Sequence, residues 1–380
     1  MSLERTYRHG DAGPAVAEIR AKLQVLELLV KNDPLEDPTS AEFDEATDRA
    51  VRAFQQQRGI TADGIVGAKT YHALEEARWR LGDRILMFLP ARLLAGDDVA
   101  ALQQRLLDMG FDCGRVDGLF GIETEQAMRE FQRNVGIVAD GTCGPASFKA
   151  LNQLTRTVVG GRPHAMRETE AISRAGPTLS GKLVIVDPGH GGGDPGVGGH
   201  GIDEAALVYD LASRVEGRLT ATGSSAYLTR GPDGRLDETE RANFANAAGA
   251  DLLLSLHIDA HRNPLASGCA TFYYGSDRIG HHSTVGERFA DLVQKEVCAR
   301  TDLLNCRSHP KTWDLLRRTR MPAVRVEVGY VTNPGDAARL SDPAFRDVVA
   351  EAVVAAVQRL YLPADEDAET GSLRIPALRR

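Results

Sequence analysis

The N-terminal part of the sequence contains an internal repeat, which requires two copies of one small fold in this region. A pattern of Thr, Ala, Phe-Gln, Gly and Asp-Gly at fixed spacing occupies residues 47–67 and recurs in residues 124–144. Each matched pair of residues is separated by 77 positions, as Phe54 and Phe131 are. Farther upstream the separation is 83, so the first copy has about six additional residues, which we place in the polar, Pro-containing loop 31–40.

Each copy has the pattern of a small helical unit: an amphipathic helix, a loop, a helix with the Phe-Gln pair, an Asp-Gly turn and a short last helix. This pattern resembles the peptidoglycan-binding domain of the PG_binding_1 type, a three-helix module, which implies two such domains at residues 1–82 and 88–156. The second copy has the family's central turn, Asp-Gly-Leu-Phe-Gly, at residues 117–121, whereas residues 40–44 of the first copy are Ser-Ala-Glu-Phe-Asp. This departure leaves ligand binding by the first copy open, because the same apolar residues also suit a plain hydrophobic core.

The C-terminal half alternates short apolar runs with amphipathic segments. The runs predict strands near residues 184–186, 226–230, 251–260 and 325–331. The amphipathic segments predict helices at residues 239–248, 288–300 and 345–360. Strands that alternate with helices predict an α/β layer structure for this part of the chain.

Polar residues stand within these predicted elements or at their ends. His190 follows the first strand in a Gly-rich turn, and His257 lies near the end of another apolar run. Glu327 lies inside an apolar strand, where a carboxylate is costly to bury without a partner, and Glu204 falls in the first turn of a helix. Two histidines and a glutamate, with a second glutamate near them, are the residue types of a catalytic zinc site. Asp259 fits either an outer residue that orients a ligand or a plain surface carboxylate.

The segment from residue 181 to 363 resembles the zinc-dependent N-acetylmuramoyl-L-alanine amidases of the amidase_3 type. Four motifs match in order, at residues 187–196, at the helix start with Glu204, at residues 255–260 and at residues 321–333. The resemblance implies a mostly parallel central sheet flanked by helices. It also implies that His190, Glu204 and His257 are zinc ligands and that Glu327 is the catalytic carboxylate. The bond that would be cut is the amide between N-acetylmuramic acid and L-alanine in peptidoglycan. No nucleophilic Ser or Cys is needed for this chemistry.

Other histidines compete as candidate ligands. His261 follows the second motif histidine by four positions, as in a helical zinc site, but the preceding run is a strand and a proline follows soon after. The pair 281–282 and His309 stand in polar segments that we expect to face solvent. His200 is close in sequence to the predicted glutamate ligand, and contact with substrate is a further possibility for it.

Composition excludes some classes of protein. The 380 residues carry a formal net charge of −8, which provides no basic surface for nucleic acid or an anionic membrane. Hydrophobic content of 42% and charged content of 26% are typical of a globular protein, and no apolar run is long enough for a transmembrane span.

The first nine residues lack the apolar core of a secretory signal, which predicts a cytoplasmic location unless a leader was removed. Five cysteines without a Cys-x-x-Cys pair predict reduced thiols.

Two hypotheses for function follow from this layout. We expect a linker at residues 157–180 and a disordered tail at residues 364–380, in which Thr370 and Ser372 are accessible hydroxyls. The first hypothesis is a zinc amidase whose N-terminal repeats bind peptidoglycan or its muropeptides. The second is a cytoplasmic regulator, because the layout also resembles the actinobacterial amidase-like regulators of peptidoglycan precursor synthesis. Such a regulator would bind a biosynthetic enzyme or a precursor, under control of tail phosphorylation.

Overall fold

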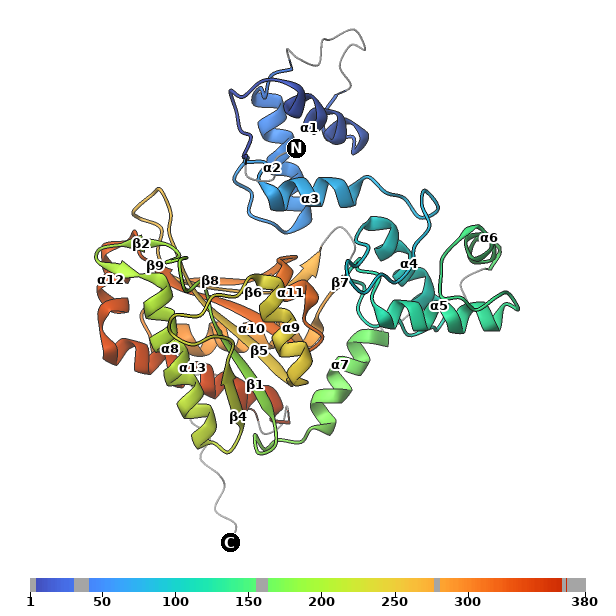
Figure 1. The fold of residues 1–380 in the computed structure, drawn as a ribbon. Helices are drawn as coiled ribbons and strands as arrows, with labels where there is room; N and C mark the ends of the chain where they lie inside the picture. The colour runs from blue at the N-terminus through green and yellow to red at the C-terminus, as the bar shows by residue number, and fades with distance from the viewer. Residues whose placement is uncertain (1–4, 31–40, 155–162, 277–280, 364–366, 368–380) are drawn as a thin grey trace. The chain divides into compact units, whose positions relative to one another are not determined.

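The structure is a computed structural model that describes residues 5–30, 41–154, 163–276, 281–363 and 367 (Figure 1). It divides into two compact units, a helical one that ends near His164 and an α/β one that follows. None of the helices in this described part of the chain is long and apolar enough to span a membrane. Thr370 and Ser372 lie outside the described residues.

The helical unit contains two similar sets of three helices, as the repeat predicts. The first set is α1 (Pro14–Val25), α2 (Glu45–Arg58) and α3 (Ala68–Ala77), and the second is α4 (Asp97–Asp108), α5 (Ile122–Asn134) and α6 (Pro145–Gln153). Each set has its own hydrophobic core, in which Phe54 and Phe131 occupy matching positions.

A buried glutamine organises the Asp-Gly turn of each repeat. The Gln55 side-chain amide donates to Asp63 Oδ1 at 2.8 Å and accepts from Gly64 N at 2.9 Å. Gln132 repeats the arrangement with Asp140 at 2.8 Å. A buried amide that has its partners holds the turn in one conformation, because leaving it unpaired costs about 1–3 kcal/mol. The repeated Phe-Gln pair therefore combines a core residue with the residue that fixes the turn.

The central turn differs between the repeats and is held differently in each. In the second repeat, Gln103 Nε2 donates to Asp117 Oδ1 at 2.8 Å and fixes the Asp-Gly turn. In the first repeat the matching residue is Arg20, whose Nη1 donates to the Glu42 carbonyl at 2.9 Å and lies 3.1 Å from Asp44 Oδ1. An arginine and an aspartate thus replace the glutamine-centred turn, and the departure leaves the three-helix core intact.

The α/β unit contains nine strands and seven helices in the described residues. The strands are β1 (Leu183–Pro188), β2 (Gly198–Gly199), β3 (Ile202–Asp203), β4 (Ser225–Leu228), β5 (Leu252–Asp259), β6 (Cys269–Ser276), β7 (His281–His282), β8 (Asn305–Lys311) and β9 (Ala323–Tyr330). The helices are α7 (Pro163–Arg174), α8 (Glu204–Ala221), α9 (Glu238–Ala248), α10 (Thr284–Arg300), α11 (Asp314–Arg318), α12 (Pro334–Ser341) and α13 (Pro343–Tyr361). Helix α7 occupies part of the segment expected as a linker, where no helix was predicted.

The main sheet is mostly parallel, which confirms the expected fold class. Its strand order is β4-β1-β5-β9-β6-β7, and β8 pairs with β6. Strands β4, β1, β5 and β9 are parallel to one another, whereas β6 runs antiparallel to β9. The carboxyl ends of β1 and β5 therefore lie side by side, with β9 next to β5, which is where such sheets place functional residues.

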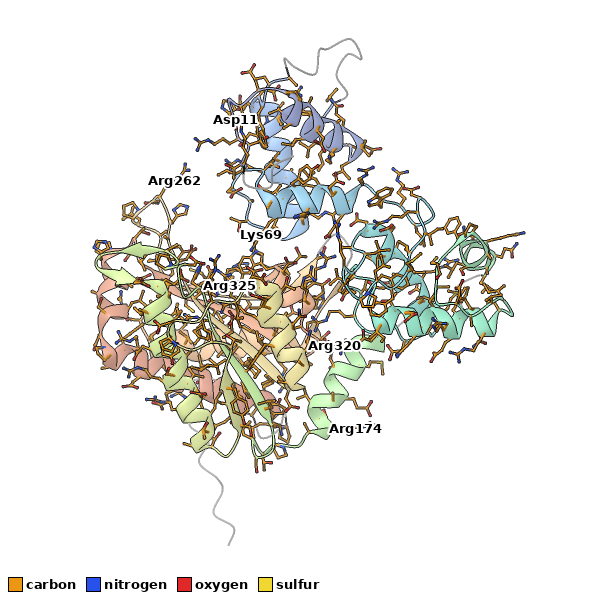
Figure 2. All side chains as sticks on the ribbon, in the orientation of Figure 1. Asp11, Lys69, Arg174, Arg262, Arg320 and Arg325 are labelled. Carbon is orange, nitrogen blue, oxygen red and sulfur yellow. The ribbon has the colours of Figure 1, made fainter. Side chains whose placement is uncertain are left out.

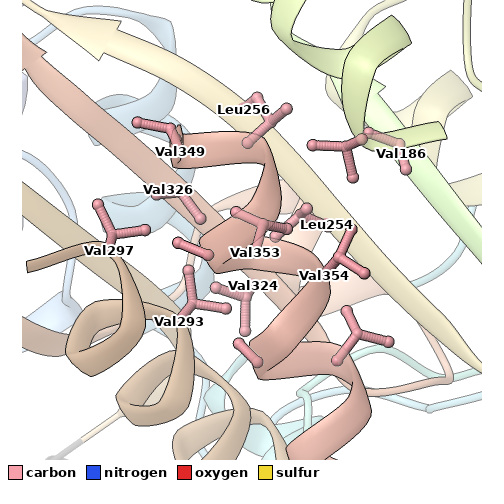
Figure 3. Packing of buried hydrophobic residues seen from close by; sticks show 14 of the residues in the cluster. Val186, Leu254, Leu256, Val293, Val297, Val324, Val326, Val349, Val353 and Val354 are labelled. Atoms are coloured by element: carbon pink, nitrogen blue, oxygen red, sulfur yellow. The ribbon is translucent and has the colours of Figure 1, made fainter. Parts of the chain in front are cut away.

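Helices α8, α10 and α13 cover one face of the sheet. Their valines and leucines pack against alternate residues of β1, β5 and β9, and Figure 3 shows part of this cluster. The labelled residues are Val186, Leu254, Leu256, Val293, Val297, Val324, Val326, Val349, Val353 and Val354. The intervening strand residues point to the other face, where α9 and α11 pack over a second cluster that includes Ile185, Leu253 and Ala323. This second face also presents Asp187, His257, Arg325 and Glu327, since they alternate with the apolar residues of the first face.

Candidate metal centre

The loop after β1 brings His190 close to the end of β5. Gly189 has no side chain, and a Cβ there would collide with the His257 imidazole. Gly196 closes the same loop with φ 71°, and a Cβ on it would collide with the Glu204 carboxylate. These two glycines are required by close approach of side chains. His190 itself has a left-handed backbone with φ 55°.

Three predicted ligands converge in this region. His190 Nε2 lies 3.3 Å from Glu204 Oε2, and His257 Nδ1 lies 3.0 Å from Glu204 Oε1. One potential ligand atom from each residue lies within 4.8 Å of the others. Two imidazoles and a carboxylate suit a zinc ion with three protein ligands and one open position. The donor set and its spacing therefore fit a divalent metal.

The electrostatics of the three residues are strongly coupled. Burial alone would raise the pKa of Glu204, but hydrogen bonds with His190 and His257 outweigh it and lower that pKa well below its usual range. Burial lowers the pKa of His257 to about 4, with a further contribution from the charge of Arg325. The contact with Glu204 raises the pKa of His190. A charged carboxylate between two histidines, one of them held neutral, is a favourable arrangement for metal ligation.

An aspartate in the loop orients the first histidine. His190 Nδ1 lies 2.8 Å from Asp194 Oδ2, which leaves Nε2 directed to Glu204. Carboxylates in this position fix the ring and tautomer of metal-bound histidines. Sequence reasoning assigned no role to Asp194, and its four-residue spacing from His190 in a Gly-rich turn was the available signal.

Two buried arginines hold the loop in place, and sequence reasoning missed both. Arg241 Nη2 donates to the His190 carbonyl at 2.6 Å, and Arg241 Nη1 lies 2.5 Å from Asp187 Oδ1. Arg230 Nη2 donates to the Gly189 carbonyl at 2.8 Å and to the Ala205 carbonyl at 2.9 Å. Arg230 thereby joins the loop of the first candidate ligand to the helix that begins with the second.

Glu327 lies beside the cluster on the neighbouring strand. It is the cross-strand partner of His257 in the β5–β9 ladder, and burial raises the pKa of Glu327 to about 7. Its carboxylate Oε1 accepts a hydrogen bond from Arg325 Nη2 at 3.0 Å. A carboxyl group with a pKa near neutrality can both accept and release a proton at physiological pH.

The remaining candidates lie elsewhere. His261 is exposed and accepts a hydrogen bond from the following loop, and His309 is exposed with its Nε2 2.7 Å from a backbone carbonyl. His282 Nε2 lies 3.1 Å from Glu287, and His200 is exposed on the turn between β2 and β3. None of these histidines belongs to the group of possible metal ligands found in the described residues. Asp259 accepts a hydrogen bond from the next backbone amide, and a contact with a candidate ligand is not among its described hydrogen bonds.

The fold and this cluster define an α/β protein with a candidate metal centre of the hydrolase kind. Comparison with known proteins then makes the assignment specific. Residues 184–359 match the family described as N-acetylmuramoyl-L-alanine amidase, and residues 12–74 and 95–151 match the putative peptidoglycan binding domain. The chain belongs to the N-acetylmuramoyl-L-alanine amidase family and has peptidoglycan-binding repeats at its N-terminal side.

The relatives differ in how much of the chain they match. The N-acetylmuramoyl-L-alanine amidase CwlM of Mycobacterium tuberculosis is 48% identical over 381 residues, which cover 98% of this chain and 93% of the relative. The amidase LytC of Bacillus subtilis is 29% identical over 196 residues, covering 52% of this chain and 38% of LytC. Among solved structures, the amidase AmiC2 of Nostoc punctiforme is 30% identical with a TM-score of 0.43, over 47% of this chain and 96% of that one.

Proposed function

We propose that the chain hydrolyses the amide bond between N-acetylmuramic acid and L-alanine in peptidoglycan, with zinc held by His190, Glu204 and His257. The observation that carries the proposal is the convergence of these three side chains next to Glu327. When bound, zinc supplies Lewis-acid polarisation of an amide carbonyl and a more acidic water.

Proton transfer, orientation of a ligand and substrate binding are then carried out by residues of the chain. Glu327 accepts the proton of the attacking water and delivers it to the leaving L-alanine nitrogen as the carbon–nitrogen bond breaks, which yields a carboxylate and a peptide amine. Its pKa of about 7 suits both transfers. Asp194 keeps the His190 ring in one orientation through the 2.8 Å contact. The N-terminal repeats bind the glycan or peptide and retain the substrate near the enzyme.

The test is cleavage of purified muropeptides by the zinc-loaded full chain, followed by mass spectrometry. We expect release of the stem peptide by the wild type and a loss of about 10²-fold or more in the rate for Glu327→Ala. His261→Ala, which changes an exposed histidine outside the cluster, serves as the matched control and should retain activity. No release by a zinc-containing wild type would contradict the proposal.

Metal binding is tested separately from activity. His190→Ala should abolish stoichiometric zinc in elemental analysis, because it removes one of three protein ligands. His309→Ala should leave the zinc content unchanged, since His309 is exposed on β8 and outside the cluster. Equal zinc in both variants would show that the ligand assignment is wrong.

A second candidate function is regulation of peptidoglycan precursor synthesis in the cytoplasm through binding of a biosynthetic enzyme. The specific observation in its favour is that all five cysteines are free thiols, which suits a reducing compartment. Fractionation of cells would test the location. Co-purification from cytosol with the full chain, compared with a chain lacking residues 364–380, would test the partner. An empty co-purification or an exclusively extracellular protein would exclude this role.

A further inference from the structure

A group of cationic and aromatic side chains lies next to Glu327 on the same face of the sheet. The group, here the Trp313 cluster, consists of Phe272, Lys311, Trp313 and Arg325, and Arg325 is labelled in Figure 2. The Arg325 guanidinium carbon lies 4.5 Å from the centre of the Trp313 ring, and Lys311 Nζ lies 5.7 Å from it. Phe272 packs on Trp313 with ring centroids 4.8 Å apart. Two cations are therefore gathered around one indole.

The cations of the Trp313 cluster outnumber the carboxylates that neutralise them. Within the described residues, Arg325 has a single carboxylate within 4.0 Å, that of Glu327, and Lys311 has none. Arg325 Nε is buried and has no hydrogen-bond partner there, so only Nη2 of the guanidinium is bonded. Partial burial lowers the pKa of Lys311. Holding two like charges together with one counter-charge is costly, and an anionic ligand would remove that cost.

The Trp313 cluster adjoins the candidate metal centre directly. Arg325 and Glu327 are two positions apart on β9 and point to the same face, and Glu327 is the cross-strand partner of His257. On its other side, Arg325 pairs with Phe272 of β6, and β6 in turn pairs with β8, which ends at Lys311. The cations thus extend from Glu327 across three neighbouring strands, away from the candidate ligands.

We propose that Arg325 and Lys311 form a carboxylate-binding subsite for the peptide part of the substrate, an inference that rests on the proposed amidase function. The planar guanidinium has donors left to bind a carboxylate, and Lys311 adds a second positive charge. Trp313 holds both side chains in place through its ring face. Because Arg325 also donates to Glu327, binding of a peptide carboxylate would fix the base that acts on the neighbouring amide. The subsite would select stem peptides in which the α-carboxylate of the D-glutamate residue is free over those in which this group is amidated, as in D-isoglutamine.

The experiment compares two ligands that differ in one carboxylate and that lack the amide bond between N-acetylmuramic acid and L-alanine. L-Ala-D-glutamate and L-Ala-D-isoglutamine are titrated into the full zinc-loaded chain, and the dissociation constants are measured by calorimetry or NMR. The wild type should bind the acid about tenfold more tightly or better, as expected for a charge-assisted hydrogen bond. Arg325→Gln and Lys311→Gln should each reduce this preference, and Arg325→Lys should keep part of it.

Arg320→Gln is the matched control, because it removes the same charge from an exposed position that precedes β9 and lies outside the Trp313 cluster (Figure 2). It should retain the full preference for the acid. If Arg325→Gln fails to fold, as judged by circular dichroism, Lys311→Gln decides the result. In kinetics with muropeptides, the ratio of KM for amidated and free substrates should fall toward one in both Gln variants.

The outcomes separate this inference from the proposed function. Equal or undetectable binding of the two dipeptides by the wild type overturns the subsite, even if muropeptides are cleaved. An equal loss of preference in Arg320→Gln also overturns it, because a general surface charge would then be the cause. A preference for the acid that depends on Arg325 and Lys311 supports the subsite, even if no cleavage occurs and the amidase function fails.

Discussion

Substitution of Arg241 tests whether a buried ion pair holds the metal-binding loop. The Arg241 side chain is 5% exposed, and its partner Asp187 is fully buried at the end of β1. The same guanidinium donates to the carbonyls of Pro188 at 2.7 Å and of His190 at 2.6 Å. Arg241→Ala would leave the Asp187 carboxylate and two backbone carbonyls without this partner. The loop that carries the first candidate ligand would lose its main support from α9.

The expected loss has two components. Removing one member of a buried ion pair costs about 3–5 kcal/mol of folding free energy. For a unit of about 200 residues this corresponds to a fall of roughly 6–20 °C in the unfolding temperature. Loss of a residue that supports a metal ligand typically weakens metal affinity by about 10–100-fold. We therefore expect Arg241→Ala to be less stable and to release zinc more readily than the wild type.

The measurement is differential scanning calorimetry of the full chain with and without zinc, together with zinc titration against a chelator. The transition that shifts when zinc is added belongs to the α/β unit. Arg174→Ala is the control, because Arg174 is a surface residue of α7 that pairs with Glu170 and should contribute less than about 1 kcal/mol. If the two variants unfolded at the same temperature and bound zinc equally, the proposed support of the loop would be refuted.

Three further predictions follow from the same contacts. Gly189→Ala should lower zinc affinity and reduce the free energy of unfolding by about 1–3 kcal/mol, because its Cβ would meet the His257 imidazole. Gly193→Ala should change neither quantity, because the space around Gly193 is open, and chelator titration of both variants checks the zinc affinity. Burial alone would raise the pKa of Asp187, but Arg241 and two hydroxyls lower it. The stabilisation by the Arg241–Asp187 pair is therefore complete above a pH of about 4, the usual pKa of an aspartate, and is lost as the pH falls through the lower pKa of the folded state. The loss of unfolding free energy caused by Arg241→Ala, measured by urea denaturation, should therefore be smaller at pH 3 than at pH 7. Gln132→Ala should destabilise the second repeat by about 1–3 kcal/mol through unpaired groups in its turn, as calorimetry of the helical unit would show.

The sequence predicted the strands and helices whose apolar pattern is local. Strands β1, β5 and β9 are runs of branched residues bounded by turns, and their predicted positions differ from the observed ones by only a few residues. The residue types of His190, Glu204 and His257, together with the resemblance to zinc amidases, pointed to a shared site. The structure brings these three side chains together as expected, and their roles stay predictions.

Strands β6 and β8 were not predicted, and the reason is their composition. Strand β6 contains Cys, Thr, Phe, Tyr and Gly and is buried along its whole length, so it shows no alternation of apolar and polar residues. Strand β8 reads Asn-Cys-Arg-Ser-His-Pro-Lys, which lacks any apolar pattern. It forms because β6 offers an edge for parallel pairing. The Trp313 cluster depends on both strands, so it could not be found from periodicity.

The residues that support the site escaped prediction for a related reason. Arg230 and Arg241 contact backbone groups of residues 188–190, which lie more than 40 positions earlier in the chain. No local spacing links an arginine to a carbonyl so far away, and arginine is usually exposed. Only the folded sheet reveals that α9 approaches the loop after β1.

The first repeat shows how a local comparison can detect a change without revealing its compensation. Aligning the repeats identifies Asp44 at the position of a glycine, and this residue alone suggests a damaged turn. In the structure Asp44 caps α2, since its Oδ1 accepts from Thr47 N at 2.8 Å, and Arg20 lies 3.1 Å from the same oxygen. The arginine at position 20 and the aspartate at position 44 are 24 positions apart, and each supplies the other's partner. An altered turn with an intact core indicates that the first repeat keeps its fold while it presents a different surface from the second, so ligand binding by one repeat is no evidence for binding by the other.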